Sequence, residues 1–248
     1  PGTYALMPRR HFHEHPSSHG DFVHISVKNH KHGFENQQAH LRKQVSFEKA
    51  AGGFMVADPL TLYDCCPTSD GASCVILAAD HVVRQFTDDP VWVRASGAGS
   101  DRLALHDRPS ITQLVATQKA SKSAYSAAGI TARDVDLAEV HDCFTIAEMI
   151  ATEDLGFADS GQGGIFARNG EGIRNEGSVC LNPSGGLKSK GHPLGATGTG
   201  QAVEVFKQLR GSVESERQVR DAEIGITHNV GGSGATCAVH VFGRDRNE

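Results

Sequence analysis

The sequence lacks any apolar run approaching the roughly 20 residues that a membrane-spanning helix requires. It also lacks a positively charged start followed by a hydrophobic stretch, the pattern of a secretory signal. Basic residues are not in excess, because the formal net charge is −5, and this leaves no broad cationic surface for nucleic acid. We therefore expect neither a membrane nor a nucleic-acid partner.

Paired cysteines are missing too. The six cysteines form no C-x-x-C spacing, so a zinc ribbon is not expected. Free thiols in a reducing compartment are the expectation, which favours a cytoplasmic or organelle-matrix location. The run from His11 to His15 formally fits the metal-binding pattern H-x-x-E-H. Because Pro16 would cut short the helix that this pattern needs, we predict a polar surface segment and no metal site.

What is present indicates a globular chain, since 38% hydrophobic and 21% charged residues are ordinary values for a folded domain. Residues 1–57 are rich in histidine and poor in long apolar runs, and we expect short surface helices at 22–31 and 39–43. Alternation of short apolar runs and helical periods begins after residue 57. The expected strands are 72–79, 91–95, 136–140, 223–229 and 235–242, and the expected helices are 111–128, 145–155 and 196–209.

Residues 156–178 hold many glycines without a period and are expected to form a loop. Strands that alternate with helices and end in a hairpin indicate an α/β fold with a mixed sheet.

The first turn with reactive side chains is His141-Asp142-Cys143-Phe144, between a predicted strand and a predicted helix. A thiol at a helix start, two residues from an imidazole, is expected to have a lowered pKa because the helix N-terminus favours negative charge. This suits a proton shuttle or a nucleophile. The alternative is a buried structural cysteine beside an exposed histidine.

The second turn is Gly191-His192-Pro193, within NPSGGLKSKGHPLGATGTG. Glycines let the backbone approach a ligand closely, and a neutral histidine there can donate a hydrogen bond to a developing oxyanion. A phosphate-cradling loop with an incidental histidine is the alternative. The specific P-loop pattern is not matched, because Leu187 rather than glycine precedes Lys188-Ser189.

The third turn, Gly231-Gly232-Ser233-Gly234, follows His228 and Asn229 between the last two strands. Consecutive glycines at such a place are typical of a simple hairpin turn. They can also expose backbone amides to a second oxyanion. Sequence leaves both interpretations open.

These three turns, in this order and spacing, resemble the thiolase superfamily, and more narrowly the sterol-carrier-protein-type thiolases and their archaeal and bacterial relatives. The stretches ISVKNHKHGFENQQAHLRK, MVADPLTLYDCCPTSDGASCVILA and NPSGGLKSKGHPLGATGTGQAVE extend the resemblance over nearly the whole chain. It implies a thiolase-like layered αβαβα fold with mixed sheets, the first half partial and the second complete. Residues 1–57 resemble part of an inserted loop domain, 58–90 the end of the N-terminal half, and 91–248 the C-terminal half.

The resemblance also implies an activity: an acyl-CoA acyltransferase that makes or cleaves 3-ketoacyl-CoA by Claisen chemistry. In it, His192 would help activate a nucleophilic cysteine, and His141 would support the oxyanion. Cys143 would move protons, since Asn229 stands where ordinary thiolases have an acid/base cysteine. The Gly231 N–H would help hold the acyl oxygen. No permanent cofactor is implied, with coenzyme A and acyl-CoA acting as substrates.

The family's nucleophilic cysteine lies in the first half, and none of the cysteines here has its context. Since the chain begins at Pro1, we expect this nucleophile outside the chain, upstream or on a separate polypeptide. A homo-oligomer is implied, and a zinc-ribbon/OB-fold protein binds some relatives. Two alternatives keep the fold: an aldolase acting on CoA-linked substrates, and a non-catalytic acyl-CoA-binding subunit.

Overall fold

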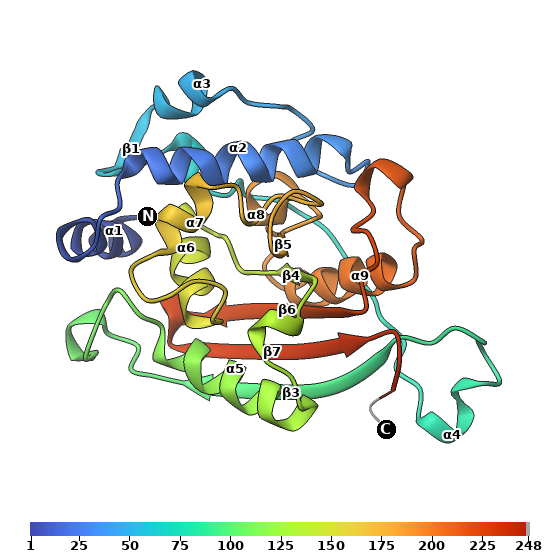
Figure 1. Ribbon diagram of the computed structural model, residues 1–248. Coiled ribbons are helices and arrows are strands. Elements are labelled where there is room, and N and C mark those ends of the chain that lie inside the picture. Colours follow the sequence, from blue (N-terminus) through green and yellow to red (C-terminus); the bar gives the residue numbers. More distant parts are fainter. Residues whose placement is uncertain (247–248) are drawn as a thin grey trace.

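A five-stranded mixed sheet forms the centre of the computed structural model, which describes residues 1–246 (Figure 1). Strand order is β3-β7-β6-β4-β5, with β4 parallel to β5 and β6, and β7 antiparallel to β6 and β3. The strands are β3 (Trp92–Ser100), β4 (Leu137–Glu139), β5 (Cys180–Leu181), β6 (Ile224–Gly231) and β7 (Thr236–Gly243). The predicted α/β class with a mixed sheet is confirmed.

Helices cover both faces of this sheet. In β6, His228 bonds Thr117 of α5 (Val115–Ala128), whereas the next residue, Asn229, bonds Gln201 of α9 (Thr197–Leu209). Successive strand residues point to opposite faces, so α5 and α9 lie on opposite sides of the sheet. The largest apolar core lies on the α5 side, which it shares with α6 (Thr145–Asp154). The three helices predicted after residue 57 are confirmed, with α5 starting four residues later than expected.

Helix α5 approaches β3 closely because both elements present small residues at their contact. A Cβ added to Gly97 would lie 2.0 Å from the Ala120 carbonyl oxygen, and one on Gly99 would lie 2.1 Å from that of Ala116. The helix ends where Gly129 takes a left-handed conformation with φ of 68°. Glycine in this strand therefore sets the spacing between helix and sheet.

Replacing Gly97 by Ala is expected to lower the free energy of unfolding by about 1–3 kcal/mol, because the new methyl group forces α5 off the sheet. Urea unfolding followed by circular dichroism measures the change. Gly2→Ala is the matched control, since a Cβ there meets nothing within 4 Å. Equal unfolding midpoints for the two variants would contradict this account of the packing.

The N-terminal segment is more buried than expected. It forms α1 (Gly2–Glu14), α2 (His19–Glu35), α3 (Phe47–Ala51), β1 (Met55–Ala57) and β2 (Leu60–Thr61). The prediction of short surface helices is wrong, because α2 crosses the α6–α8 layer (Figure 1) and buries Phe22 and Asn29 completely. Residues 39–43 are not helical. His11, expected at the surface, is buried and lies 3.1 Å from a Glu153 carboxylate oxygen.

Residues 72–79 contradict their prediction as a buried strand. They have no regular structure, and Ile76 is 93% and Leu77 79% exposed. The segment leads into α4 (Asp80–Val83) and projects from the body beside the start of β3 and the end of β7 (Figure 1). An apolar run becomes a buried strand only beside partner strands, and residues 1–246 provide it with none.

The remaining elements are short. Residues 156–178 are mainly loop, as predicted, interrupted by α7 (Gly163–Arg168), and α8 (Gly186–Ser189) follows β5. Single 3₁₀ turns occur at Leu62–Asp64, Leu105–Asp107, Ala132–Asp134, Ser215–Arg217 and Gly232–Gly234. Among the helices of residues 1–246, none combines the length and the apolar character needed to cross a bilayer.

Candidate active site

The turn of residues 141–144, called the HDCF turn here, joins the carboxyl end of β4 to α6. Two hydrogen bonds hold the backbone at the start of this turn. The amide of Val140 donates to the Asn182 side-chain oxygen at 2.9 Å, and the amide of His141 to His228 Nδ1 at 3.4 Å. The turn thus lies at the carboxyl edge of parallel strands, where sites of α/β proteins gather.

The turn of residues 191–193, called the GHP turn, lies between β5 and α9 at the same edge. Gly191 has φ of 112°, a conformation that favours glycine. The amide of His192 donates to Ser69 Oγ at 3.2 Å, and His192 forms a parallel bridge with Thr68. Ser69 was missed as a contributor, although it lies in the CCPTSDGAS stretch that carries the family resemblance.

The two turns bring His141 and His192 together. Their ring centroids lie 5.0 Å apart, with the ring planes at 89°. Burial, followed by the charge of His192, lowers the pKa of His141 to about 3. Burial and then Lys190 lower the pKa of His192. Both imidazoles are therefore neutral at pH 7, and each has one nitrogen that donates a hydrogen bond and one that accepts.

Hydrogen bonding assigns the tautomer of His192. The Thr197 hydroxyl donates to the Pro193 carbonyl oxygen at 3.0 Å, so it accepts from His192 Nδ1 at 2.8 Å. His192 Nε2 is left as a proton acceptor and becomes a donor only after it takes a proton. In His141, Nδ1 is buried and has no hydrogen-bond partner among residues 1–246. The hydrogen bonds thus leave one nitrogen of each ring without an assigned partner, His192 Nε2 and the buried His141 Nδ1.

Cys143 is 7% exposed and packs against Leu187, Tyr4 and Cys66. Burial raises the pKa of its thiol to about 12; the Tyr4 hydroxyl acts in the opposite direction and Cys66 raises the value further. The predicted lowering of this pKa is wrong, because loss of hydration outweighs the attraction of the α6 N-terminus for a thiolate. Cys143 is accordingly a protonated thiol at pH 7, suited to donate a proton.

Gly231 ends β6 and pairs with Thr236 across the final hairpin. The residues with left-handed φ are its three successors Gly232, Ser233 and Gly234, and the buried Arg108 guanidinium donates to the Ser233 carbonyl oxygen at 2.9 Å. The hairpin interpretation of these glycines is therefore confirmed. No contact described within residues 1–246 joins Gly231 to the paired imidazoles, and its catalytic role stays a prediction.

A buried polar network beneath the two turns was not anticipated. Asn29 Nδ2 donates to an Asp142 carboxylate oxygen at 2.8 Å and to Glu148 Oε2 at 2.7 Å, and Asn182 Nδ2 donates to the same Glu148 oxygen at 2.9 Å. Asp142 lies in the 141–144 turn, which the sequence analysis selected because of His141 and Cys143. Asn29 is 113 residues away in the chain, and only folding reveals its connection.

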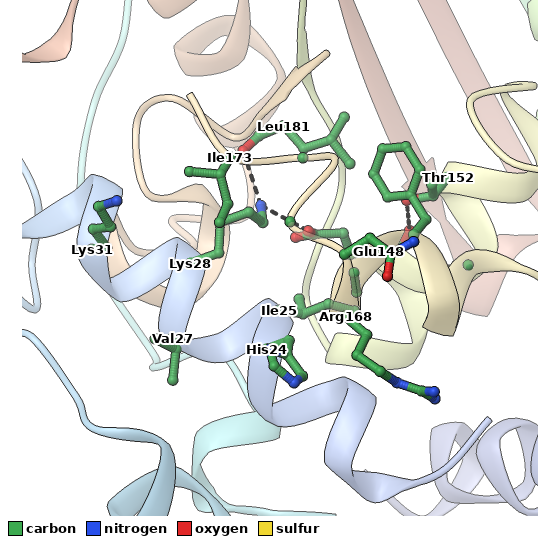
Figure 2. A pocket seen from close by; sticks show the side chains of 16 residues that line it. His24, Ile25, Val27, Lys28, Lys31, Glu148, Thr152, Arg168, Ile173 and Leu181 are labelled. Atoms are coloured by element: carbon green, nitrogen blue, oxygen red, sulfur yellow. Dashed lines mark hydrogen bonds and ion pairs between the residues drawn. The ribbon is translucent and has the colours of Figure 1, made fainter. Parts of the chain in front are cut away.

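Lys28 supports this network from α2. Figure 2 shows its side chain reaching toward Glu148 and Leu181, and its Nζ lies 2.8 Å from Glu148 Oε1 and 2.9 Å from the Leu181 carbonyl oxygen. These groups line a cavity of about 270 Å³ whose rim includes Lys31 and Arg168. The ion pair is thus buried and fully bonded, which makes it a structural support of the HDCF turn.

Two neutral imidazoles and a protonated thiol lie in two turns at the carboxyl edge of a layered α/β sheet, and these are groups that can give and take protons. Residues 97–244 match the family model described as thiolase C-terminal domain-like. The chain belongs to the thiolase family.

Named relatives agree with this assignment. The chain is 49% identical over 244 residues to acetyl-CoA acetyltransferase of Methanothermobacter thermautotrophicus, a match that covers 98% of the chain and 63% of that protein. It is 36% identical to sterol carrier protein 2 of Bos taurus, covering 95% of the chain and 44% of that protein. The chain therefore spans less than two thirds of the length of either relative.

A solved structure called Ltp2-ChsH2(DUF35) aldolase superposes with a TM-score of 0.86 at 22% identity, over 98% of this chain and 63% of that one. At this identity the match establishes the fold alone.

Proposed function

We propose that the protein to which this chain belongs is an acyl-CoA acyltransferase of the thiolase type, which makes or cleaves 3-ketoacyl-CoA. The observation that carries the proposal is the contact between His141 and His192, with Cys143 in the same turn as His141. The 49% identity to a protein named acetyl-CoA acetyltransferase supports the choice of reaction.

In the thiolytic direction, a nucleophilic cysteine attacks the 3-keto carbon and forms an acyl-enzyme thioester. His192 Nε2 takes the proton of that thiol, and the resulting N–H donates to the oxyanion together with His141. The bond between the α- and β-carbons breaks, and its electron pair accepts the Cys143 proton. This releases the fragment that carries coenzyme A and leaves the other acyl group on the nucleophilic cysteine. Free coenzyme A then gives its thiol proton to the Cys143 thiolate and attacks the acyl-enzyme thioester, which forms the shortened acyl-CoA. The released cysteine thiolate takes back the proton that His192 Nε2 had accepted.

The nucleophile of this scheme is assigned to a first half outside the 248 residues. We retain the division into a loop-domain part (1–57), the end of the N-terminal half (58–90) and the C-terminal half (91–248). The exposed apolar segment 72–79 supports it, because Ile76 and Leu77 would be buried by a second sheet. No permanently bound cofactor is needed, since the thiols and imidazoles perform each step.

Incubating the full-length protein with acetoacetyl-CoA and free coenzyme A tests this function. The expected result is formation of acetyl-CoA, measured by liquid chromatography, at a rate that depends on both substrates. Acetyl-CoA formation indistinguishable from a no-enzyme control would contradict the thiolase assignment for this substrate class.

An aldolase acting on CoA-linked substrates is the second candidate, favoured by the TM-score of 0.86 to the Ltp2-ChsH2(DUF35) aldolase. An aldolase would cleave a β-hydroxyacyl-CoA without consuming free coenzyme A. That structure joins two named components, Ltp2 and ChsH2(DUF35), and this supports a protein partner for this chain, beside a homo-oligomer. A non-catalytic acyl-CoA-binding subunit would give neither reaction.

A further inference from the structure

Asp142 has no exposed surface, and both of its carboxylate oxygens accept hydrogen bonds from outside the HDCF turn. Oδ1 accepts from the Leu187 amide at 2.6 Å. Oδ2 accepts from the Lys188 amide at 3.3 Å and from Asn29 Nδ2 at 2.8 Å. The donors belong to α8 and α2, so this one side chain joins three segments that are remote in sequence.

Gly186 allows the Asp142 carboxylate to approach the α8 backbone this closely. Its φ is +62°, and a Cβ built on it would lie 2.4 Å from Asp142 Oδ2. No other residue type leaves room for the carboxylate against the α8 backbone. Helix α8 runs to Ser189, and His192 follows three residues later. The Asp142 carboxylate therefore connects the turn that carries His141 and Cys143 to the segment that delivers His192.

The charges around Asp142 come from three elements. Burial has the largest effect and raises the pKa of Asp142, and Glu148 of α6 raises it further. Lys188 of α8 and Lys28 of α2 lower this pKa. The ammonium groups of these lysines bond elsewhere: Lys188 Nζ donates to the Asp64 carbonyl oxygen at 2.6 Å, and Lys28 pairs with Glu148. The Asp142 carboxylate is thus held by amide N–H groups of fixed position and not by the flexible ammonium groups.

We propose that Asp142 is a positioning residue of the thiolase site, whose carboxylate holds the HDCF and GHP turns at the separation that pairs His141 with His192. The inference rests on the proposed function. Asp142 acts through these turns and makes no contact with substrate.

The test uses the full-length protein carrying Asp142→Asn, which keeps the size of the side chain and replaces one accepting oxygen by a donor facing N–H groups. Displacement of reacting groups by about 1 Å can cost on the order of 10²-fold in rate, and a loss of kcat of about this size is expected. The KM for acetoacetyl-CoA is expected to stay unchanged. A structure of the variant is expected to place the two imidazole centroids further apart than 5.0 Å.

Glu153→Gln is the matched control. Glu153 is also a buried carboxylate of this region, and it accepts from the Gly161 and Gly163 amides at 2.8 and 2.9 Å, but neither glycine belongs to a catalytic turn. Its kcat is expected to follow wild type at a temperature where both proteins are folded. Equal kcat losses in Glu153→Gln and Asp142→Asn would overturn the inference, because the effect would then be one of general stability.

Asn29→Ala keeps the carboxylate and its two amide donors, and is expected to give a smaller loss of the same kind. If Asp142→Asn does not fold, Asn29→Ala replaces it as the test variant. An unchanged kcat in Asn29→Ala would then overturn the inference. Wild-type kcat in a folded Asp142→Asn variant overturns it directly while leaving the proposed function intact. Wild-type kcat in Cys143→Ala would instead overturn the proposed function.

Discussion

Replacing Cys143 by Ala in the full-length protein is expected to lower kcat by about 10²–10⁴-fold, the usual contribution of a positioned general acid or base. The thiol is protonated and buried, so it can give a proton to the carbanion formed when the carbon–carbon bond breaks. Alanine leaves the backbone of the HDCF turn in place. Acyl-CoA binding, measured by isothermal titration calorimetry, is therefore expected to persist while acetyl-CoA formation is lost.

Cys237→Ala is the control for this variant. Cys237 lies in β7, 4% exposed within the main core, and burial raises its thiol pKa to about 11. Its loss removes a buried thiol of similar character without touching either turn. Turnover of the Cys237 variant is expected to match wild type, and a Cys143→Ala enzyme that keeps full kcat would exclude Cys143 from the chemistry.

The 248-residue chain alone is expected to form no acyl-enzyme with acetoacetyl-CoA. Its turnover should fall on the order of 10⁶-fold below that of the full-length protein, the scale observed when a covalent nucleophile is removed. Cys65 and Cys66 provide no substitute, because burial raises the pKa of each thiol. Cys74 lies in the exposed 72–79 segment and lines a cavity with Gly191 and Pro193, but neither a predicted helix start nor a small-residue turn directly follows it.

Intact-mass spectrometry after mixing with substrate measures this directly. The whole protein is expected to gain one acyl group on a cysteine outside these 248 residues, either upstream or on a separate polypeptide, and the short chain none. Hydrogen exchange of residues 72–79 is a second readout: strand formation against a first-half sheet is expected to slow it in the full-length protein. An acyl adduct on a cysteine of the short chain would place the nucleophile within these residues.

Much of the fold followed from local patterns. Helix α5 ends at Ala128 as predicted, because the left-handed cap at Gly129 needs no partner beyond the helix itself. The hairpin of β6 and β7 likewise depends on glycines adjacent in the chain. The strand predicted at residues 72–79 is wrong. Their apolar pattern predicts burial, but burial of a strand requires neighbouring strands, and residues 1–246 supply none at this place.

By itself the sequence determined which groups are the candidates for the chemistry: the imidazoles of His141 and His192 and the thiol of Cys143, each in a turn that precedes a helix. Tertiary structure alone decided how they behave. It paired the two rings and raised the pKa of Cys143, contrary to expectation. It also enclosed Asp142 between α8 and α2. Pairing distance, hydration and hydrogen-bond partners depend on segments far apart in the chain, and these quantities set the proton affinity of each group.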